Sequence, residues 1–292
     1  MVRGDILTLV MHLNNLTFPQ ANKYLHNLLN LKYEFNKNKV EVVNYDPLEI
    51  FKKIKKRQSA LNVYDIKFLD EEILDEYLPL LHIDWVREGI MEWTRKEFNL
   101  GFSGSKKRII IPHRYYSGTR NEYVGIIGRT IVKEWDLLDI PKYYPLKSYP
   151  KGLNLYGLQE NYQYIQEAGY VVCFEAEKST LKRHSRNDKT GVAVCGHEVT
   201  PEQVKILIGL NVDIVIAFDE GIDQNYIRSV CDKFYPIRNV SYIWDKHGLL
   251  KSKESPADKE NKIYQYLFKH RIKYDESERR KYLEWQEKQV KN

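Results

Sequence analysis

The chain has 292 residues, of which 42% are apolar and 29% charged, a composition that excludes a disordered chain and a mini-protein held together by disulfides. A net charge of +6 permits a polyanionic partner without requiring one. The three cysteines, Cys173, Cys195 and Cys231, lie far apart, so we expect neither a disulfide framework nor a cysteine-rich zinc site but a reducing, cytoplasmic location. We expect no membrane contact, since no uncharged apolar run approaches the roughly 18 to 20 residues that span a bilayer.

The first region predicted is 1–60. Apolar residues recur at helical spacing from Gly4 to Leu31 and are interrupted at Thr17-Phe18-Pro19, which predicts a helix, a turn and a second helix. Residues 36–61 are polar and contain a dense basic stretch at 52–57. Two interpretations fit this stretch, a short basic amphipathic helix inside a linker or a solvated connector.

The second region predicted, 61–165, is a basic α+β subdomain. A helical pattern from Asp70 to Phe98 gives way to two β-branched runs, at 108–112 and 123–129, which are separated by a glycine-containing turn and predict an antiparallel ribbon. Residues 94–151 contain 12 Lys+Arg and 5 Asp+Glu, so their excess of +7 exceeds the net charge of the whole chain. The positive charge is therefore concentrated here.

The third region predicted, 166–260, is a parallel sheet with flanking helices. Four short apolar runs begin at Val171, Val192, Ile214 and Val240, as expected of strands that are buried on both faces. Most successive runs start about 20 residues apart, which leaves room for a returning helix such as the one expected to begin at Thr200-Pro201. Residues 261–292 are expected to form a charged C-terminal helix. The predicted fold class is α/β.

Three carboxylates follow the predicted strands: Glu175 after the first, Asp219 after the third, and Asp258 after the fourth. Because ligands gather beyond the carboxyl ends of parallel strands, these acids are candidate ligands for a hard divalent cation, Mg²⁺ or Mn²⁺. Further candidate ligands lie next to them, namely Glu177, Glu220 and Asp223. The alternative from spacing alone is that acids at strand ends are helix caps or solvated loop residues.

The histidines give no metal-ligand spacing. His113, His184, His197 and His247 are scattered, so each is expected to be a surface or hydrogen-bonded side chain. Cys173 and Cys195 fall inside predicted strands and are expected to fill the core.

The acids resemble a known family when they are read with their surroundings. In order and spacing, four motifs resemble the Toprim domain that DnaG-type primases share with topoisomerases: Glu175-Ala176-Glu177-Lys178-Ser179, Val192-Ala193-Val194-Cys195-Gly196, Thr200-Pro201-Glu202-Gln203 and Ile216-Ala217-Phe218-Asp219-Glu220-Gly221. Upstream motifs resemble the primase core in particular: Ile109-Ile110-Ile111-Pro112, Gly125-Ile126-Ile127-Gly128-Arg129, Pro141-Lys142-Tyr143 and Lys151-Gly152. The resemblance covers roughly residues 70–260.

By position, the resemblance makes Glu175, Asp219 and Asp258 the catalytic and metal-binding acids. It likewise implies that Arg129, Lys142 and Lys151 bind phosphates of the nucleotide or of the template. Residues 4–21 also show a fainter similarity to the helical tail that follows the zinc ribbon of bacterial primases. The cysteine pairs that would bind the zinc of such a ribbon do not precede this tail, so we expect no zinc. Either the ribbon is lost, it resides on another chain, or this chain begins internally.

The family motifs are altered at three acidic positions. The usual Glu-Gly-x-x-Asp has Ser179 in place of its aspartate, and the usual Asp-x-Asp has Gly221 in place of its second aspartate. The usual Asp-Pro dipeptide is Ser255-Pro256 here, so Asp258 is the acid that is left in this motif. A site with fewer acids is expected to bind a metal ion more weakly.

The resemblance implies a DNA primase, a nucleotidyltransferase that makes short RNA primers on single-stranded DNA during replication. Its partners would be the DNA template, ribonucleoside triphosphates, and a replicative helicase or a separate zinc-bearing chain; a reduced version of this kind suits a bacteriophage. The altered motifs keep a second hypothesis open, a non-catalytic module that binds single-stranded DNA or the replisome. A third, a Toprim nuclease, leaves the matches at Arg129, Lys142 and Lys151 unexplained.

Overall fold

The computed structural model describes residues 5–31, 66–196 and 198–291. By their internal contacts the residues form two compact units, Met1–Gln58 and Ser59–Asn292. The basic stretch at 52–57 and His197 lie outside the described residues. Among the helices that are described, none is both long and apolar enough to cross a membrane.

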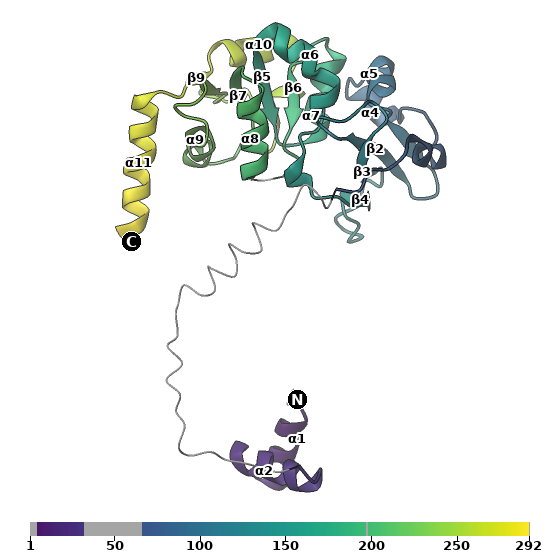
Figure 1. Cartoon of the computed structure of the whole chain (residues 1–292), viewed down its shortest axis with the longest axis vertical. Coiled ribbons are helices and arrows are strands. Elements are labelled where there is room, and N and C mark those ends of the chain that lie inside the picture. The colour runs from purple at the N-terminus through teal and green to yellow at the C-terminus, as the bar shows by residue number, and fades with distance from the viewer. Residues whose placement is uncertain (1–4, 32–65, 197, 292) are drawn as a thin grey trace. The chain divides into compact units, whose positions relative to one another are not determined.

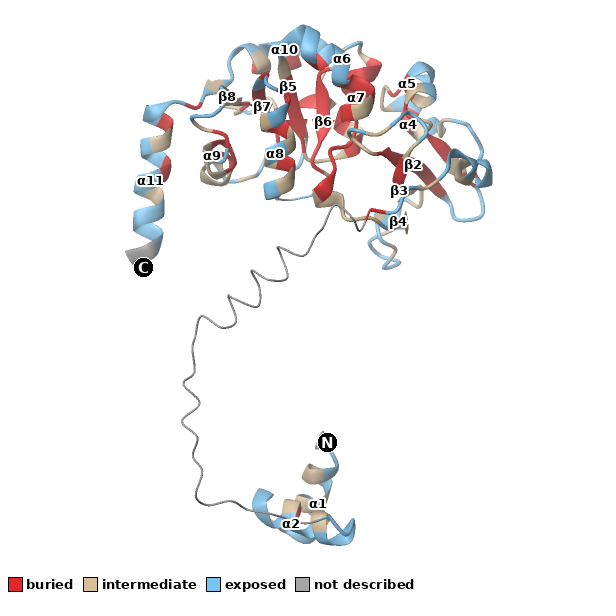
Figure 2. Cartoon of the chain, viewed as in Figure 1, coloured by how far each residue is buried: buried red, intermediate tan, exposed pale blue. Residues whose placement is uncertain are grey.

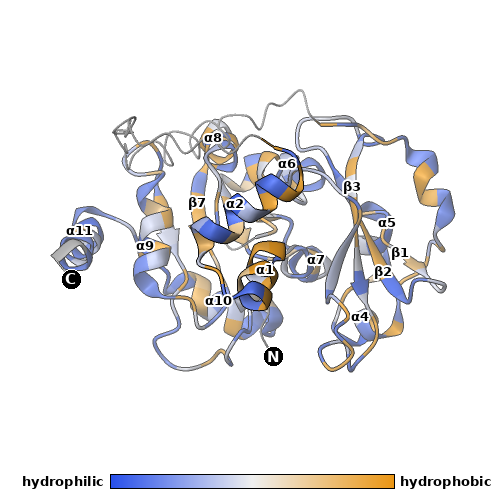
Figure 3. Ribbon diagram, turned by 90° about the horizontal axis from the view of Figure 1, so that it is seen from below, coloured by the Kyte–Doolittle hydropathy of each residue, from blue (hydrophilic) through white to orange (hydrophobic). Residues whose placement is uncertain are grey.

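The first unit contains a helical hairpin of α1 (Ile6–Asn14) and α2 (Phe18–Leu28). Asp5 caps α1 by accepting from the Thr8 amide at 2.9 Å, and Asn15 ends the helix in the left-handed region, at φ 51°. The Thr17 amide donates to Gln20 Oε1 at 2.9 Å and starts the second helix. The predicted helix, turn and helix are thus confirmed, and Figure 3 colours most of α1 hydrophobic.

The second unit begins with an antiparallel sheet whose strand order is β1-β2-β3-β4. Its elements, with the short helices that precede it, are η2 (Glu71–Glu76), α4 (Ile83–Arg87), α5 (Glu92–Glu97), β1 (Gly101–Ser103), β2 (Arg108–Arg114), β3 (Tyr123–Thr130) and β4 (Tyr143–Lys147). The pairing of β2 with β3 confirms the predicted ribbon. Ile109 and Ile111 pack with Trp85 on one face, while Ile110 packs with Tyr77 on the other.

The second sheet has the order β6-β5-β7-β8-β9. Its strands and helices are η3 (Lys151–Leu153), α6 (Leu158–Ala168), β5 (Tyr170–Phe174), α7 (Glu177–Ser185), β6 (Gly191–Ala193), α8 (Pro201–Gly209), β7 (Asp213–Ile216), α9 (Gln224–Asp232), β8 (Val240–Tyr242), η4 (Pro256–Asp258), α10 (Asn261–Lys269), β9 (Ile272–Lys273) and α11 (Glu276–Lys291). The four strands β5 to β8 pair in parallel, which confirms the α/β class. The capping box of Thr200 and Gln203 begins α8 as expected.

The C-terminal prediction was incomplete. Residues 261–292 were expected to form one charged helix, whereas α10 and α11 are separated by β9, which pairs antiparallel with β8. A strand of two residues is too short to give an alternating pattern, so no sequence signal marked it. The expected boundary between 165 and 166 falls inside α6.

Alternating side chains bury both faces of the parallel sheet. Val171 and Cys173 of β5 join a core cluster that includes residues of α6, α8 and α9, while Val172 and Phe174 join another that includes Tyr264 and Leu267 of α10. Figure 1 shows α8 in front of this sheet, and Figure 2 shows β2 and β3 of the first sheet and β5, β6 and β7 of the second largely buried.

Buried hydrogen-bonding side chains link helix α7 to helix α5. Thr94 of α5 lies 2.8 Å from His184 Nδ1, and Ser185 Oγ donates to Thr94 Oγ1, also at 2.8 Å. Burial, together with the nearby Lys189 charge, lowers the pKa of His184 to about 4 from its ordinary value of 6.5. His184 is therefore neutral in the folded chain at neutral pH.

We predict that acid destabilises the contact between α5 and α7 through His184. Below pH 6.5 the unfolded chain binds a proton at this position and the folded chain does not, so the free energy of unfolding falls until about pH 4. The full effect is on the order of 3 kcal/mol. Denaturant unfolding between pH 7 and pH 4 measures it, and His184→Gln flattens the pH dependence. His247→Gln, in an exposed loop, is the matched control and leaves the profile unchanged; the same flattening in both variants would contradict the assignment.

Candidate active site at the carboxyl rim of the parallel sheet

The three predicted acids lie at one rim of the parallel sheet. Glu175 directly follows β5, Asp219 comes three residues after β7, and Asp258 ends the one-turn helix η4. Glu175 Oε1 accepts from the Asp219 amide at 3.4 Å. Asp258 is close enough for its charge to act on Asp219. The structure thus brings together three carboxylates that are separated by more than 80 positions from first to last.

Asp219 has a buried carboxylate whose charged form is disfavoured by its surroundings. Burial raises its pKa to about 6, and the neighbouring charge of Asp258 adds to the effect. Its Oδ1 atom is buried, and no described residue hydrogen-bonds to it. A divalent cation at this oxygen would offset both costs. On this observation the acids present fit a Mg²⁺ or Mn²⁺ ion, which Glu175 and Asp219 would hold.

Asp258 already has a cationic partner. Lys182 Nζ lies 2.6 Å from Asp258 Oδ1, and the Ser255 amide donates to the other carboxylate oxygen at 3.0 Å. Burial alone would raise the pKa of Asp258, but the hydrogen bond from Lys182 brings it below its ordinary value. A metal ion at Asp258 must therefore compete with the Lys182 ammonium.

The three additional acids have different surroundings. Asp223 caps α9 by accepting from the Asn225 and Tyr226 amides, so it matches the cap interpretation. Burial and the charge of Asp245 raise the pKa of Glu220. Glu177 is turned toward His113 and Lys151, at 3.3 and 3.9 Å. The side chain of Glu177 thus pairs with His113 and Lys151.

Two of the predicted basic residues share a cavity of about 390 Å³ beside the rim. Arg129 of β3 and Lys142 line it together with Trp135, whose ring lies 5.8 Å from Lys142 Nζ. Partial burial and the like charges of Arg129 and Lys178 lower the pKa of Lys142, whereas Asp219 acts in the opposite direction. The third, Lys151, begins η3 and pairs with Glu177 instead.

A group of charged residues missed by the sequence reasoning connects these parts. Glu88 accepts from Lys178 at 2.5 Å and lies 3.5 Å from Lys182 and 3.9 Å from Arg129. Lys178 and Lys182 are four positions apart just after Glu175, and this spacing could have predicted that both lie on one face of a helix. Nothing local marked Glu88, because its partners lie far away in the sequence.

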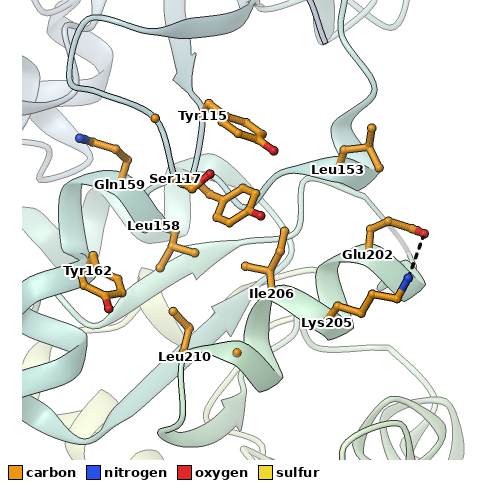
Figure 4. A pocket seen from close by; sticks show the side chains of 13 residues that line it. Tyr115, Ser117, Leu153, Leu158, Gln159, Tyr162, Glu202, Lys205, Ile206 and Leu210 are labelled. Atoms are coloured by element: carbon orange, nitrogen blue, oxygen red, sulfur yellow. Dashed lines mark ion pairs between the residues drawn. The ribbon is translucent and has the colours of Figure 1, made fainter. Parts of the chain in front are cut away.

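A larger pocket of about 1000 Å³ lies elsewhere and contains none of the predicted site residues. Tyr115 and Tyr116 line it with apolar residues of α6 and α8, and Figure 4 shows the Glu202–Lys205 ion pair on one side and Tyr162 on the other. Tyr115 and Tyr116 also pack against each other, with ring centroids 4.8 Å apart. This pocket is therefore separate from the candidate site at the rim.

Comparisons with known proteins identify the family. The chain is 30% identical over 287 residues to the SPbeta prophage-derived uncharacterized protein YorJ of Bacillus subtilis, which covers 88% of this chain and 75% of YorJ. The chain belongs to the YorJ family. It is also 23% identical over 250 residues to the DNA primase of Clostridium acetobutylicum, but spans only 40% of that protein's length. No family model matches the chain.

Comparison with solved structures identifies the fold of this chain. The Aquifex aeolicus primase, comprising zinc-binding and RNA polymerase domains, aligns with a TM-score of 0.58 and 19% identity over 93% of this chain and 71% of that one. The DnaG primase catalytic domain bound to single-stranded DNA aligns with a TM-score of 0.55 and 14% identity over 70% of this chain and 77% of that one. The YorJ-family chain thus has the fold of a DnaG-type primase core.

We predict that Lys182 weakens metal binding at the rim of the YorJ-family site. Lys182→Met removes the ammonium that competes for Asp258, and the affinity for Mn²⁺ rises by about tenfold because a full charge is lost from a partly buried site. Calorimetric titration with Mn²⁺ alone gives the affinity. The matched control, Lys205→Met on the exposed face of α8, leaves it unchanged. Equal or weaker Mn²⁺ binding by Lys182→Met would contradict the competition.

Proposed function

We propose that the chain is a DNA primase, which makes short RNA primers on single-stranded DNA by metal-dependent nucleotidyl transfer. The observation that carries the proposal is the convergence of Glu175, Asp219 and Asp258 at one rim, within electrostatic reach of Lys142 in the basic cavity. Nucleotidyl transfer requires such a pairing, because the acids hold the cations and the basic side chains bind phosphates. The primase fold supports this combination.

In the proposed reaction the 3′-hydroxyl of one nucleotide attacks the α-phosphate of the next. The new O3′–P bond forms as the bond to pyrophosphate breaks, and the hydroxyl proton passes to solvent water. When bound, a divalent ion supplies charge that lowers the pKa of the hydroxyl and stabilises the departing pyrophosphate. Glu175 and Asp219 would hold it, while Arg129 and Lys142 orient phosphates and Lys151 adds a contact that competes with Glu177.

Template binding in this proposal uses the cavity beside β3. Arg129 and Lys142 supply positive charge there, and Trp135 offers an aromatic face beside Lys142. Base–aromatic stacking contributes about 1 to 3 kcal/mol per base and tolerates any sequence. A solved neighbour of the same fold is described as bound to single-stranded DNA, which supports this assignment. The other proposed partners are ribonucleoside triphosphates and a replicative helicase or a separate zinc-bearing chain, in the cytoplasm of a phage-carrying host.

A second function has its own supporting observation. Lys182 pairs with Asp258 and Lys178 pairs with Glu88, and Ser179 and Gly221 replace two family acids. A rim with fewer acids, one of them already paired with a lysine, suits a module that binds single-stranded DNA or a replication partner without chemistry. A nuclease remains the third alternative and shares the metal site.

A primer-synthesis assay separates the three functions. With labelled ribonucleotides, Mg²⁺ or Mn²⁺ and a mixed-sequence single-stranded template, we expect labelled oligomers that fall at least a hundredfold in Asp219→Asn, since that variant loses a metal-binding charge. Asp213→Asn, at the opposite end of β7, is the matched control and retains activity. DNA retention without product supports the binding module, and a shortened template supports the nuclease.

The salt dependence of DNA binding tests the basic cavity. If Arg129 and Lys142 each contact one phosphate, Arg129→Ala and Lys142→Ala each reduce the slope of log K against log salt by about 0.7. Fluorescence anisotropy with a labelled oligonucleotide at several salt concentrations measures the slope. Lys205→Ala leaves it unchanged, and slopes that match wild type in both cavity variants would place the DNA elsewhere.

A further inference from the structure

A second cluster of ligand-type side chains contains none of the three rim acids, although the Cys195 amide donates to the Glu175 carbonyl at 2.9 Å. His113 of β2, Glu177 at the start of α7 and Cys195 just after β6 come from three different elements. One atom from each, a ring nitrogen, a carboxylate oxygen and the sulfur, lies within 4.8 Å of the other two. The His113 side chain has no exposed surface, and that of Glu177 is 5% exposed.

The two buried ligand atoms face each other at ion-pair distance. His113 Nε2 and Glu177 Oε1 are 3.3 Å apart, yet neither atom has a hydrogen-bond partner among the described residues. Two ligands of a tetrahedral ion with bonds of about 2.0 to 2.1 Å are separated by roughly 3.3 Å. The pair therefore has the spacing of two metal ligands.

The other ring nitrogen of His113 is fixed by a neighbour. Tyr149 Oη lies 2.5 Å from His113 Nδ1, which orients the ring and directs Nε2 toward Glu177 and Cys195. Metal-ligating histidines usually have such a partner on the second nitrogen. The tyrosine thus supplies the support that a metal ligand needs.

From this geometry we propose that His113, Glu177 and Cys195 bind a Zn²⁺ ion, with a fourth position open to water or a substrate group. A nitrogen, an oxygen and a thiolate sulfur suit Zn²⁺ and exclude Mg²⁺, which selects oxygen ligands. Binding releases the thiol proton of Cys195. Lys151 Nζ, now 3.9 Å from Glu177 Oε1, has a side chain that is 36% exposed and can turn to solvent.

This proposal is independent of primer synthesis and differs from the expectation of no zinc, which the cobalt experiment below tests. That expectation considered only cysteine pairs close in sequence, whereas these ligands are spread over 82 positions, from 113 to 195. It also assigns a function to a histidine that the sequence reasoning placed among ordinary hydrogen-bonded side chains.

Cobalt spectroscopy on the full metal-free chain tests the site. Titration with Co²⁺ gives one equivalent that shows the near-ultraviolet thiolate-to-cobalt band and the visible bands of a tetrahedral ion, and Zn²⁺ displaces it. Cys195→Ser abolishes the thiolate band, and Tyr149→Phe weakens Co²⁺ binding by about tenfold. Cys231→Ser, which alters a buried cysteine of α9 outside the cluster, keeps the band.

The outcomes are separable from those of the primer assay. Asp219→Asn retains the thiolate band, because the rim acids offer no sulfur, so a chain without polymerase activity still tests the zinc site. A folded wild-type chain without the band overturns the proposal, and so does a band that survives in Cys195→Ser. Circular dichroism of each variant establishes that it is folded.

Discussion

Charge balance at the carboxyl rim is the constraint on which the site depends. Parallel strands end at one edge, so the acids that follow β5 and β7 accumulate there with Asp258, and part of their surface is removed from water. Carboxylates so close together repel one another, and burial increases the cost. Cations must offset that cost, and the chain supplies Lys178 and Lys182 from one face of α7.

The local patterns of the sequence were sufficient for the regular elements. Short uninterrupted apolar runs predicted β5 to β8, and two β-branched runs joined by a glycine-containing turn predicted the ribbon of β2 and β3, because each pattern is local in the sequence. The positions of Glu175 and Asp219 just after parallel strands were enough to predict that the two acids lie close together. The contacts of Glu88 with Lys178 and Lys182 were not predictable in this way, since they depend on how α4 docks against α7.

Glu177 shows the limit of reading a site from spacing. It lies two residues after Glu175 and was a further candidate ligand beside the rim acids, but α7 begins at this point and its first side chain points to His113. Against the effect of complete burial, His113 lowers the pKa of Glu177 to about 2. Two neighbouring acids thus belong to two environments, one with oxygen ligands only and the other with nitrogen and sulfur within reach.

This division separates the two ions that the chain is proposed to bind. Metal selectivity follows ligand type, so hard ions favour the oxygen ligands of the rim and Zn²⁺ favours the cluster with the thiolate. The loss of acids at Ser179 and Gly221 lowers the negative charge of the rim, and Lys182 lowers it further. An ion that also binds Asp258 must therefore displace the Lys182 ammonium or arrive with the negative charge of a triphosphate, which would compensate for the lost ion pair. Metal binding at this rim is in that case coupled to nucleotide binding, and the affinity measured with the metal alone is a lower limit for the working site.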